Sequence, residues 1–111
     1  MPQTFIASPD SPLRARFLDE YYGTFATDRI PTPPAAAQSY DAVRLLAAAI
    51  AQASSTDGPT IRRALENLQS EVDGVVTMYR HPFSSDDHEA TKRSNVVFGT
   101  VHAARVVQAS D

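Results

Sequence analysis

The residues most suited to chemistry in this 111-residue sequence lie in one short stretch. His81, Asp86, Asp87 and His88 are residue types that bind metal ions or transfer protons. Their spacing matches no metal-binding motif, and the surrounding residues are typical of a turn. The pattern favours a solvated turn, so we assign no catalytic residue and no metal ligand.

Two serines in the same stretch, Ser84 and Ser85, raise the alternative of a serine nucleophile with His88 as its base. Such a nucleophile needs a strand-to-helix elbow and an oxyanion hole, and the surrounding sequence has neither signature. The four glycines are too scattered to form a phosphate-binding loop. The sequence therefore predicts a protein that is not an enzyme and has no cofactor. A small hydrolase or metal enzyme that uses His81 and His88 is the least favoured alternative.

The composition indicates a small, mildly acidic domain. Hydrophobic residues make up 42% of the chain, and the absence of cysteine excludes disulfides and thiolate metal sites. Ten Lys and Arg against 13 Asp and Glu give a net charge of -3, which provides no basic surface for nucleic acid. The longest apolar run, residues 42–53, is shorter than the ~20 residues that span a bilayer. Residues 1–4 lack the positive region of a signal peptide.

Two amphipathic helices are predicted in the first half of the chain. The first, residues 12–25, follows the N-cap Ser11 and repeats apolar residues at every fourth position. We assign its aromatic stripe to a core face rather than to a partner contact: Phe17, Tyr21 and Phe25. The second helix, residues 34–53, is rich in alanine, which allows close approach of neighbours and predicts that it is well buried.

A third helix is predicted after the break at residues 54–58. Asp57 or Gly58 would cap it, and it would end near Gln69 or Ser70. Its polar face is expected in solvent and consists of Arg62, Arg63, Glu66 and Asn67.

The residue pattern changes to that of strands in the last third of the chain. Residues 75–79 predict one strand, and residues 95–99 followed by 100–107 predict one or two more. Residues 84–94 are expected to form a loop, and residues 4–6 a loop or a short strand. Three helices followed by two or three strands indicate the α/β class, with too few strands for a complete sheet.

Several phrases in fixed order carry a family resemblance. They are FLDEYYG at 17–23, AQSYDAVRLLAAAI at 37–50, and TDG at 56–58 with IRRALENL at 61–68. In this order they resemble the C-terminal third of the branched-chain amino-acid type of extracellular solute-binding protein, a periplasmic binding protein of type I that serves an ABC transporter. The continuation agrees with that family's end: GVV at 74–76, PFS at 82–84, Asp87-His88 and Val96-Val97.

The resemblance implies an α/β fragment of a two-lobed fold that closes on a small ligand such as an amino acid, an amide or an aromatic acid. Residues 1–111 would be a single partial domain, with a helical lobe segment at 8–73 and a hinge crossing with terminal strands at 74–111. In the family, the turn entering the second helix borders the ligand cleft. The resemblance therefore points to Ala35 and Gln38 as ligand-binding residues.

We expect the chain to be the C-terminal portion of such a receptor and to bind little ligand alone. The parent's partners would be its small-molecule ligand and the permease of the ABC transporter. The parent would be periplasmic, and the chain expressed as it stands would be cytoplasmic. The helices at 12–25 and 34–53 would then expose apolar faces. The alternative is a stand-alone helical interaction module, a homodimer joined through those faces.

Overall fold

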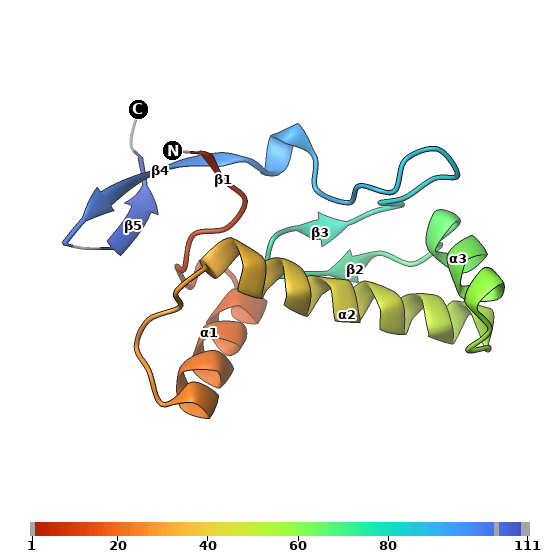
Figure 1. Cartoon of the computed structure of the whole chain (residues 1–111), viewed down its shortest axis with the longest axis horizontal. Coiled ribbons are helices and arrows are strands. Elements are labelled where there is room, and N and C mark those ends of the chain that lie inside the picture. The colour runs from red at the N-terminus through yellow and green to blue at the C-terminus, as the bar shows by residue number, and fades with distance from the viewer. Residues whose placement is uncertain (1, 104, 110–111) are drawn as a thin grey trace.

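The computed structural model describes residues 2–103 and 105–109 (Figure 1). Within these ranges the helices are α1 (Pro12–Phe25), α2 (Pro33–Ala53) and α3 (Gly58–Glu66). The strands in the same ranges are β1 (Pro2–Gln3), β2 (Val72–Asp73), β3 (Met78–Tyr79), β4 (Val97–His102) and β5 (Arg105–Gln108), with a 3-10 turn at Arg93–Asn95. The predicted α/β class is confirmed, although β1 precedes the helices and four strands follow them in this part of the chain.

The described strands form two small antiparallel sheets. One has the order β1-β4-β5, with Val101 opposite Val106, and the other is the β2–β3 hairpin, with Val72 opposite Tyr79. Figure 1 shows α2 along the length of the molecule, the β2–β3 hairpin beside it, and the β1-β4-β5 sheet at one end. Extents of 47 × 32 × 20 Å describe an elongated shape.

The buried apolar side chains form two clusters, one against each half of α2. The first joins the N-terminal segment, α1 and the hairpin turn, and contains Phe5, Leu13, Phe17, Leu18, Ile30, Ala37, Val75 and Val76. The second joins α2, α3 and the hairpin, and contains Leu45, Ala49, Ala64, Leu68, Val72 and Tyr79. The β2–β3 hairpin therefore contributes to both clusters.

The bounds and cap of α1 are those predicted from the sequence. The Ser11 side chain accepts a hydrogen bond from the Arg14 N–H at 3.1 Å, as an N-cap residue does. The aromatic stripe is a core face only at its start. Phe17 packs edge-on against Phe5, with ring centroids 5.9 Å apart, whereas Phe25 is 63% exposed. The assignment of Phe25 to the core was wrong, because the last turn of α1 extends beyond the elements that cover its beginning.

α2 begins one residue earlier than predicted and is buried along one stripe only. The buried positions recur every four residues: Ala37, Asp41, Leu45 and Ala49. Val43 is 67% exposed and Leu46 is 43% exposed on the remaining surface. The prediction of a well-buried helix was therefore wrong, and the prediction that α1 and α2 expose apolar faces is confirmed.

α3 has the predicted cap and a shorter length. The Asp57 carboxylate accepts from the Thr60 N–H at 3.2 Å, but the helix ends at Glu66 rather than near Gln69. The cause is Gln52 of α2, whose side chain accepts from the Gln69 N–H at 2.8 Å and donates to the Asn67 carbonyl at 3.0 Å. Because these backbone groups are bonded to α2, the chain leaves the helix there.

The strand predicted at residues 75–79 forms only in its second half. Val75 and Val76 lie in the turn of the β2–β3 hairpin, which the Gly74 N–H closes by donating to the Thr77 carbonyl at 2.9 Å. The N–H groups of both valines bond to the side chain of Asp41 instead of to a strand. The backbone N–H groups that the β-rich sequence predicted to bond to a neighbouring strand therefore bond to a side chain of α2.

The ends of the described chain agree with prediction in part. Of the two alternatives for residues 4–6, the loop is the one that forms, because Phe5 turns into the core and is 1% exposed. The short strand β1 precedes this loop. The closing hairpin is divided between His102 and Arg105 rather than after Gly99. The division into 8–73 and 74–111 stays a prediction. No helix of the described residues is long and apolar enough to cross a membrane.

Candidate functional site

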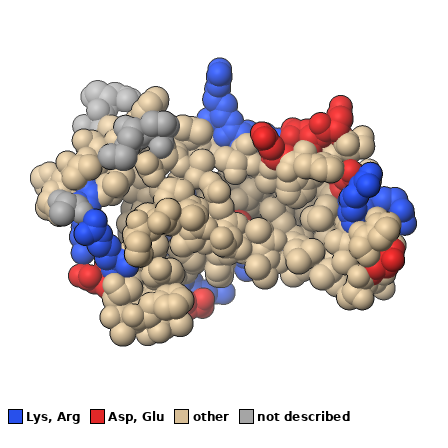
Figure 2. Space-filling view, in the orientation of Figure 1, with Lys and Arg blue, Asp and Glu red and all other residues tan. Residues whose placement is uncertain are grey.

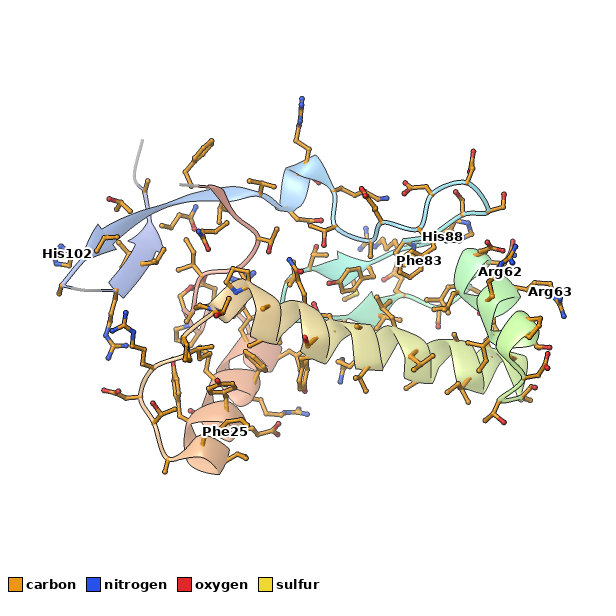
Figure 3. All side chains as sticks on the ribbon, viewed as in Figure 1. Phe25, Arg62, Arg63, Phe83, His88 and His102 are labelled. Carbon is orange, nitrogen blue, oxygen red and sulfur yellow. The ribbon has the colours of Figure 1, made fainter. Side chains whose placement is uncertain are left out.

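A groove runs between α2, α3 and the segment that follows β3. The part along α2 has a volume of about 290 Å³, and Gln38, Asp41, Tyr79, Phe83 and His88 contribute to its lining. A neighbouring hollow of about 330 Å³ shares Phe83 and His88 and extends along α3. Figure 3 shows Phe83 and His88 together on the side of the hairpin that faces α3.

The floor of this groove contains a buried carboxylate with three hydrogen-bond donors. Asp41, which is 1% exposed, accepts from the N–H groups of Val75 at 2.7 Å and Val76 at 2.9 Å. The Tyr79 hydroxyl donates to the same side chain at 2.6 Å. Burial raises the pKa of the Tyr79 hydroxyl above its usual range, and the bond to Asp41 raises it further. The hydroxyl is therefore a donor at any physiological pH.

Arginines of the two long helices bond to carbonyl groups of the same hairpin. Arg14 of α1 donates from Nε to the Val75 carbonyl at 2.6 Å and from Nη2 to the Val76 carbonyl at 3.1 Å. Arg44 of α2 donates to the carbonyl of Asp73 at 2.8 Å. Asp41 and Arg14 together thus satisfy the N–H and the carbonyl groups of Val75 and Val76, and Arg44 bonds to the strand before them.

Glu66 lies at the far end of the groove, although the sequence placed it in solvent. Its side chain is 9% exposed, and Oε2 lies 2.9 Å from His88 Nε2 and 3.5 Å from Arg62 Nε. The hydrogen bond to His88 is the main cause that lowers the pKa of Glu66, with a further contribution from the charge of Arg62 and opposition from burial. The contact ties the segment after β3 to α3.

The two predicted ligand-binding residues lie in the first turns of α2. Ala35 is exposed. Gln38, also exposed, donates from Nε2 to the Thr4 hydroxyl at 2.7 Å and lines the end of the groove. The amide carbonyl of Gln38 accepts no hydrogen bond from the described residues. A polar group at the groove is therefore free to contact a ligand.

The four residues that could have bound a metal or moved a proton have separate partners. His81 Nδ1 lies 3.3 Å from the carbonyl of Leu68, Asp86 accepts from the Ser84 hydroxyl at 2.8 Å, and Asp87 pairs with Lys92 at 2.8 Å. The lysine, the charge of His88 and a backbone bond from Glu89 lower the pKa of Asp87. Among residues 2–103 and 105–109, no three His, Cys, Asp or Glu side chains are grouped to hold a metal ion.

The comparison with known families decides the class of this chain. A protein-family model, described as periplasmic binding protein, matches residues 1–110. The chain belongs to the periplasmic binding protein family. Members of this family are periplasmic proteins that bind solutes. Neither a curated protein nor a solved structure matches the chain.

Sequence reasoning missed the polar residues that shape the periplasmic binding protein's groove. The signal for Asp41 was present, because the acid lies in register with the apolar positions 37, 45 and 49 of one helical stripe. A carboxylate at such a position must find donors when it is buried. Glu66 gave no equivalent signal, since its spacing from Arg62 is also that of a solvated ion pair.

Proposed function

We propose that this chain is the C-terminal portion of a receptor of the branched-chain amino-acid type, which delivers its ligand to the permease of an ABC transporter. The observation that carries the proposal is the family match over residues 1–110, taken with the ordered phrases of the sequence. The exposed apolar surface of α2 supports it, since a larger lobe would cover Val43 and Leu46. No observation on the described residues favours the alternative of a stand-alone interaction module.

The ligand of the complete receptor is an amino acid, an amide or an aromatic acid, and it reaches the first turns of α2. Gln38 contacts the ligand through its side-chain amide, and Ala35 leaves room for the ligand beside the helix. The geometry that supports these roles is the exposure of both residues and the position of Gln38 at the groove. The groove of the chain alone is open on one side, so it encloses too little of a ligand for tight binding.

Calorimetry on the chain alone tests this proposal. Branched-chain amino acids, their amides and aromatic acids should give no measurable heat of binding at micromolar concentrations. Clear micromolar affinity for any of them would overturn the proposal that these 111 residues are part of a larger binding unit.

The role of Gln38 is tested in the receptor that contains residues 1–111 and the rest of its lobes. Gln38→Ala should weaken ligand binding by about fivefold, because one hydrogen bond is worth about 1 kcal/mol. Ser39→Ala is the matched control, since Ser39 is the next residue on the same helix and is also exposed. Equal affinities of the two variants would remove Gln38 from the ligand site.

A further inference from the structure

A small cavity lies beyond the N-terminal end of α2 and shares no lining residue with the groove. Its volume is about 110 Å³, and four segments form it: the N-terminal segment, α1, the loop before α2, and β5. Its apolar lining includes Phe5, Ile6 and Ile30, which are 1%, 7% and 5% exposed. One wall of the cavity is therefore formed by apolar side chains, of which Phe5 and Ile30 belong to the core.

Two arginines line the same cavity, Arg29 from the loop and Arg105 from β5. The described residues that line it include no acidic side chain. Figure 2 shows basic side chains gathered at this end of the molecule, beside the closing hairpin. The cavity thus combines an apolar wall with two permanent positive charges.

Asp28 pairs with one of these two arginines, so it neutralises only part of their positive charge. Asp28 accepts from Arg105 Nη1 through its carbonyl at 3.2 Å and from Nη2 through its carboxylate at 3.3 Å. The Asp28 side chain is 91% exposed, so water weakens this pair. A guanidinium has five N–H donors, of which Arg105 uses two here. No acceptor from the described residues bonds to the guanidinium of Arg29.

We propose that this cavity binds a small carboxylate that carries a short apolar tail. Guanidinium groups bind carboxylates through paired hydrogen bonds, and the apolar wall accommodates the tail. At about 30 Å³ for each water molecule, the volume corresponds to about four waters, so it takes the tail of a ligand of about six non-hydrogen atoms. Isobutyrate has this size. The carboxylate of that ligand then lies at the rim, where Arg29 and Arg105 are both exposed. The site is separate from the groove at Gln38, and the proposal does not rest on the proposed function.

An NMR titration of the whole chain with isobutyrate tests the proposal. Backbone signals of Arg29, Ile30 and Arg105 should shift in a saturable manner, with a dissociation constant in the millimolar range. Isobutyramide has the same shape without the charge and should produce no saturable shift. Acetate lacks most of the tail and should bind about threefold to tenfold more weakly, because each buried methylene contributes favourably. Equal shifts with isobutyramide, or equal affinity for acetate, would overturn the proposal.

Variants locate the site. Arg29→Gln should weaken isobutyrate binding about fivefold or more, because a charge-assisted pair is lost. Arg63→Gln is the matched control, since Figure 3 places Arg63 on α3, at the opposite end of the molecule from His102 of the closing hairpin. The spectrum of each variant reports whether it is folded. If Arg29→Gln and Arg63→Gln bind equally, the carboxylate does not bind in this cavity.

Asp28→Asn gives an independent test, because it should strengthen isobutyrate binding where Arg29→Gln weakens it. The substitution removes the negative charge that competes for Arg105 Nη2, while the bond from Nη1 to the Asp28 carbonyl stays, so isobutyrate should bind about twofold to fivefold more tightly. Inorganic phosphate is titrated alongside as an anion without a tail. Unchanged affinity of Asp28→Asn, or phosphate binding as tight as that of isobutyrate, would contradict a site selective for carboxylates with a tail.

Discussion

Asp41 occupies a position on α2 where the residues one turn away on either side are apolar and buried. A buried carboxylate destabilises a fold unless donors replace its water. Here two backbone N–H groups and the Tyr79 hydroxyl do so, at 2.6 to 2.9 Å. Arg14 bonds to the carbonyls of the same turn. Asp41 therefore positions the hairpin, because all three groups that donate to its side chain belong to the hairpin.

Replacing Asp41 with asparagine should be strongly destabilising. The amide keeps the shape of the side chain, but its NH₂ group would face a backbone donor of the hairpin turn. We expect the free energy of unfolding to fall by about 2 to 4 kcal/mol, because a buried donor loses its charged acceptor. Urea denaturation monitored by circular dichroism measures this loss. Asp19→Asn, on the exposed side of α1, is the control and should change the value by less than about 0.5 kcal/mol.

The contact between Glu66 and His88 should make the stability of the fold depend on pH in the acid range. Because the pKa of Glu66 is lowered in the folded chain, its carboxylate adds stability above its ordinary pKa of about 4.3 and loses that contribution as the pH falls further. The stability difference between the wild type and Glu66→Gln should therefore shrink as the pH falls from about 5 to about 3. Thermal unfolding across that range measures the difference. Glu20→Gln, an exposed control, should show no such convergence.

The β2–β3 hairpin depends on close approach at Gly74. A Cβ atom at this position would lie 2.5 Å from Tyr79 Cε2 and 2.7 Å from Asp41 Oδ2. Both neighbours belong to the buried network, so neither can move without breaking a hydrogen bond. The hairpin therefore requires a residue without a side chain at its turn.

Two glycine-to-alanine substitutions should consequently change the free energy of unfolding in opposite directions. Gly74→Ala should reduce the free energy of unfolding by about 2 kcal/mol or more, because the added methyl group overpacks the core. Gly23→Ala, in α1 with nothing within 4 Å of the added carbon, should raise it by about 0.5 to 1 kcal/mol. Urea denaturation compares both with the wild type. A neutral Gly74→Ala would contradict the close approach.

At the level of elements, the helices were predicted far better than the strands. Ser11 and Asp57 are caps whose partners lie three residues away, so local sequence is sufficient to find them. The start of β3 was misplaced because the N–H groups of Val75 and Val76 bond to Asp41, more than 30 positions earlier. No local pattern reveals a partner at that distance.

The whole molecule leaves one long face of α2 uncovered. Val43 is 67% exposed and Leu46 is 43% exposed, with alanines beside them. The described residues form an elongated shape of 47 × 32 × 20 Å, and none of their other elements covers this face. The chain alone should therefore associate with itself through this face.

Size-exclusion chromatography with light scattering tests this expectation. The wild-type chain should form species of mixed size whose mean mass grows with concentration, because apolar surface is removed from water on contact. Val43→Gln combined with Leu46→Gln should reduce this association without lowering the melting temperature by more than a few degrees, since both side chains are largely exposed. Leu45→Gln, at a position 5% exposed, is the contrasting control and should unfold the chain. A monodisperse wild-type dimer would instead support the interaction-module alternative.

The sequence by itself determined the helices, their caps, the α/β class and the family, because each rests on local spacing or on the order of short phrases. Only the tertiary structure decided which partners the buried polar groups have. The apolar stripe of α2 marks the position of Asp41 as buried, but not the donors that meet its carboxylate there. For Glu66, nothing within a few residues distinguishes it from an acid in solvent. Their partners Val75 and His88 lie 34 and 22 positions away along the chain. The cavity at Arg29 and Arg105 has the same origin, since its walls meet only when the two ends of the chain pack together.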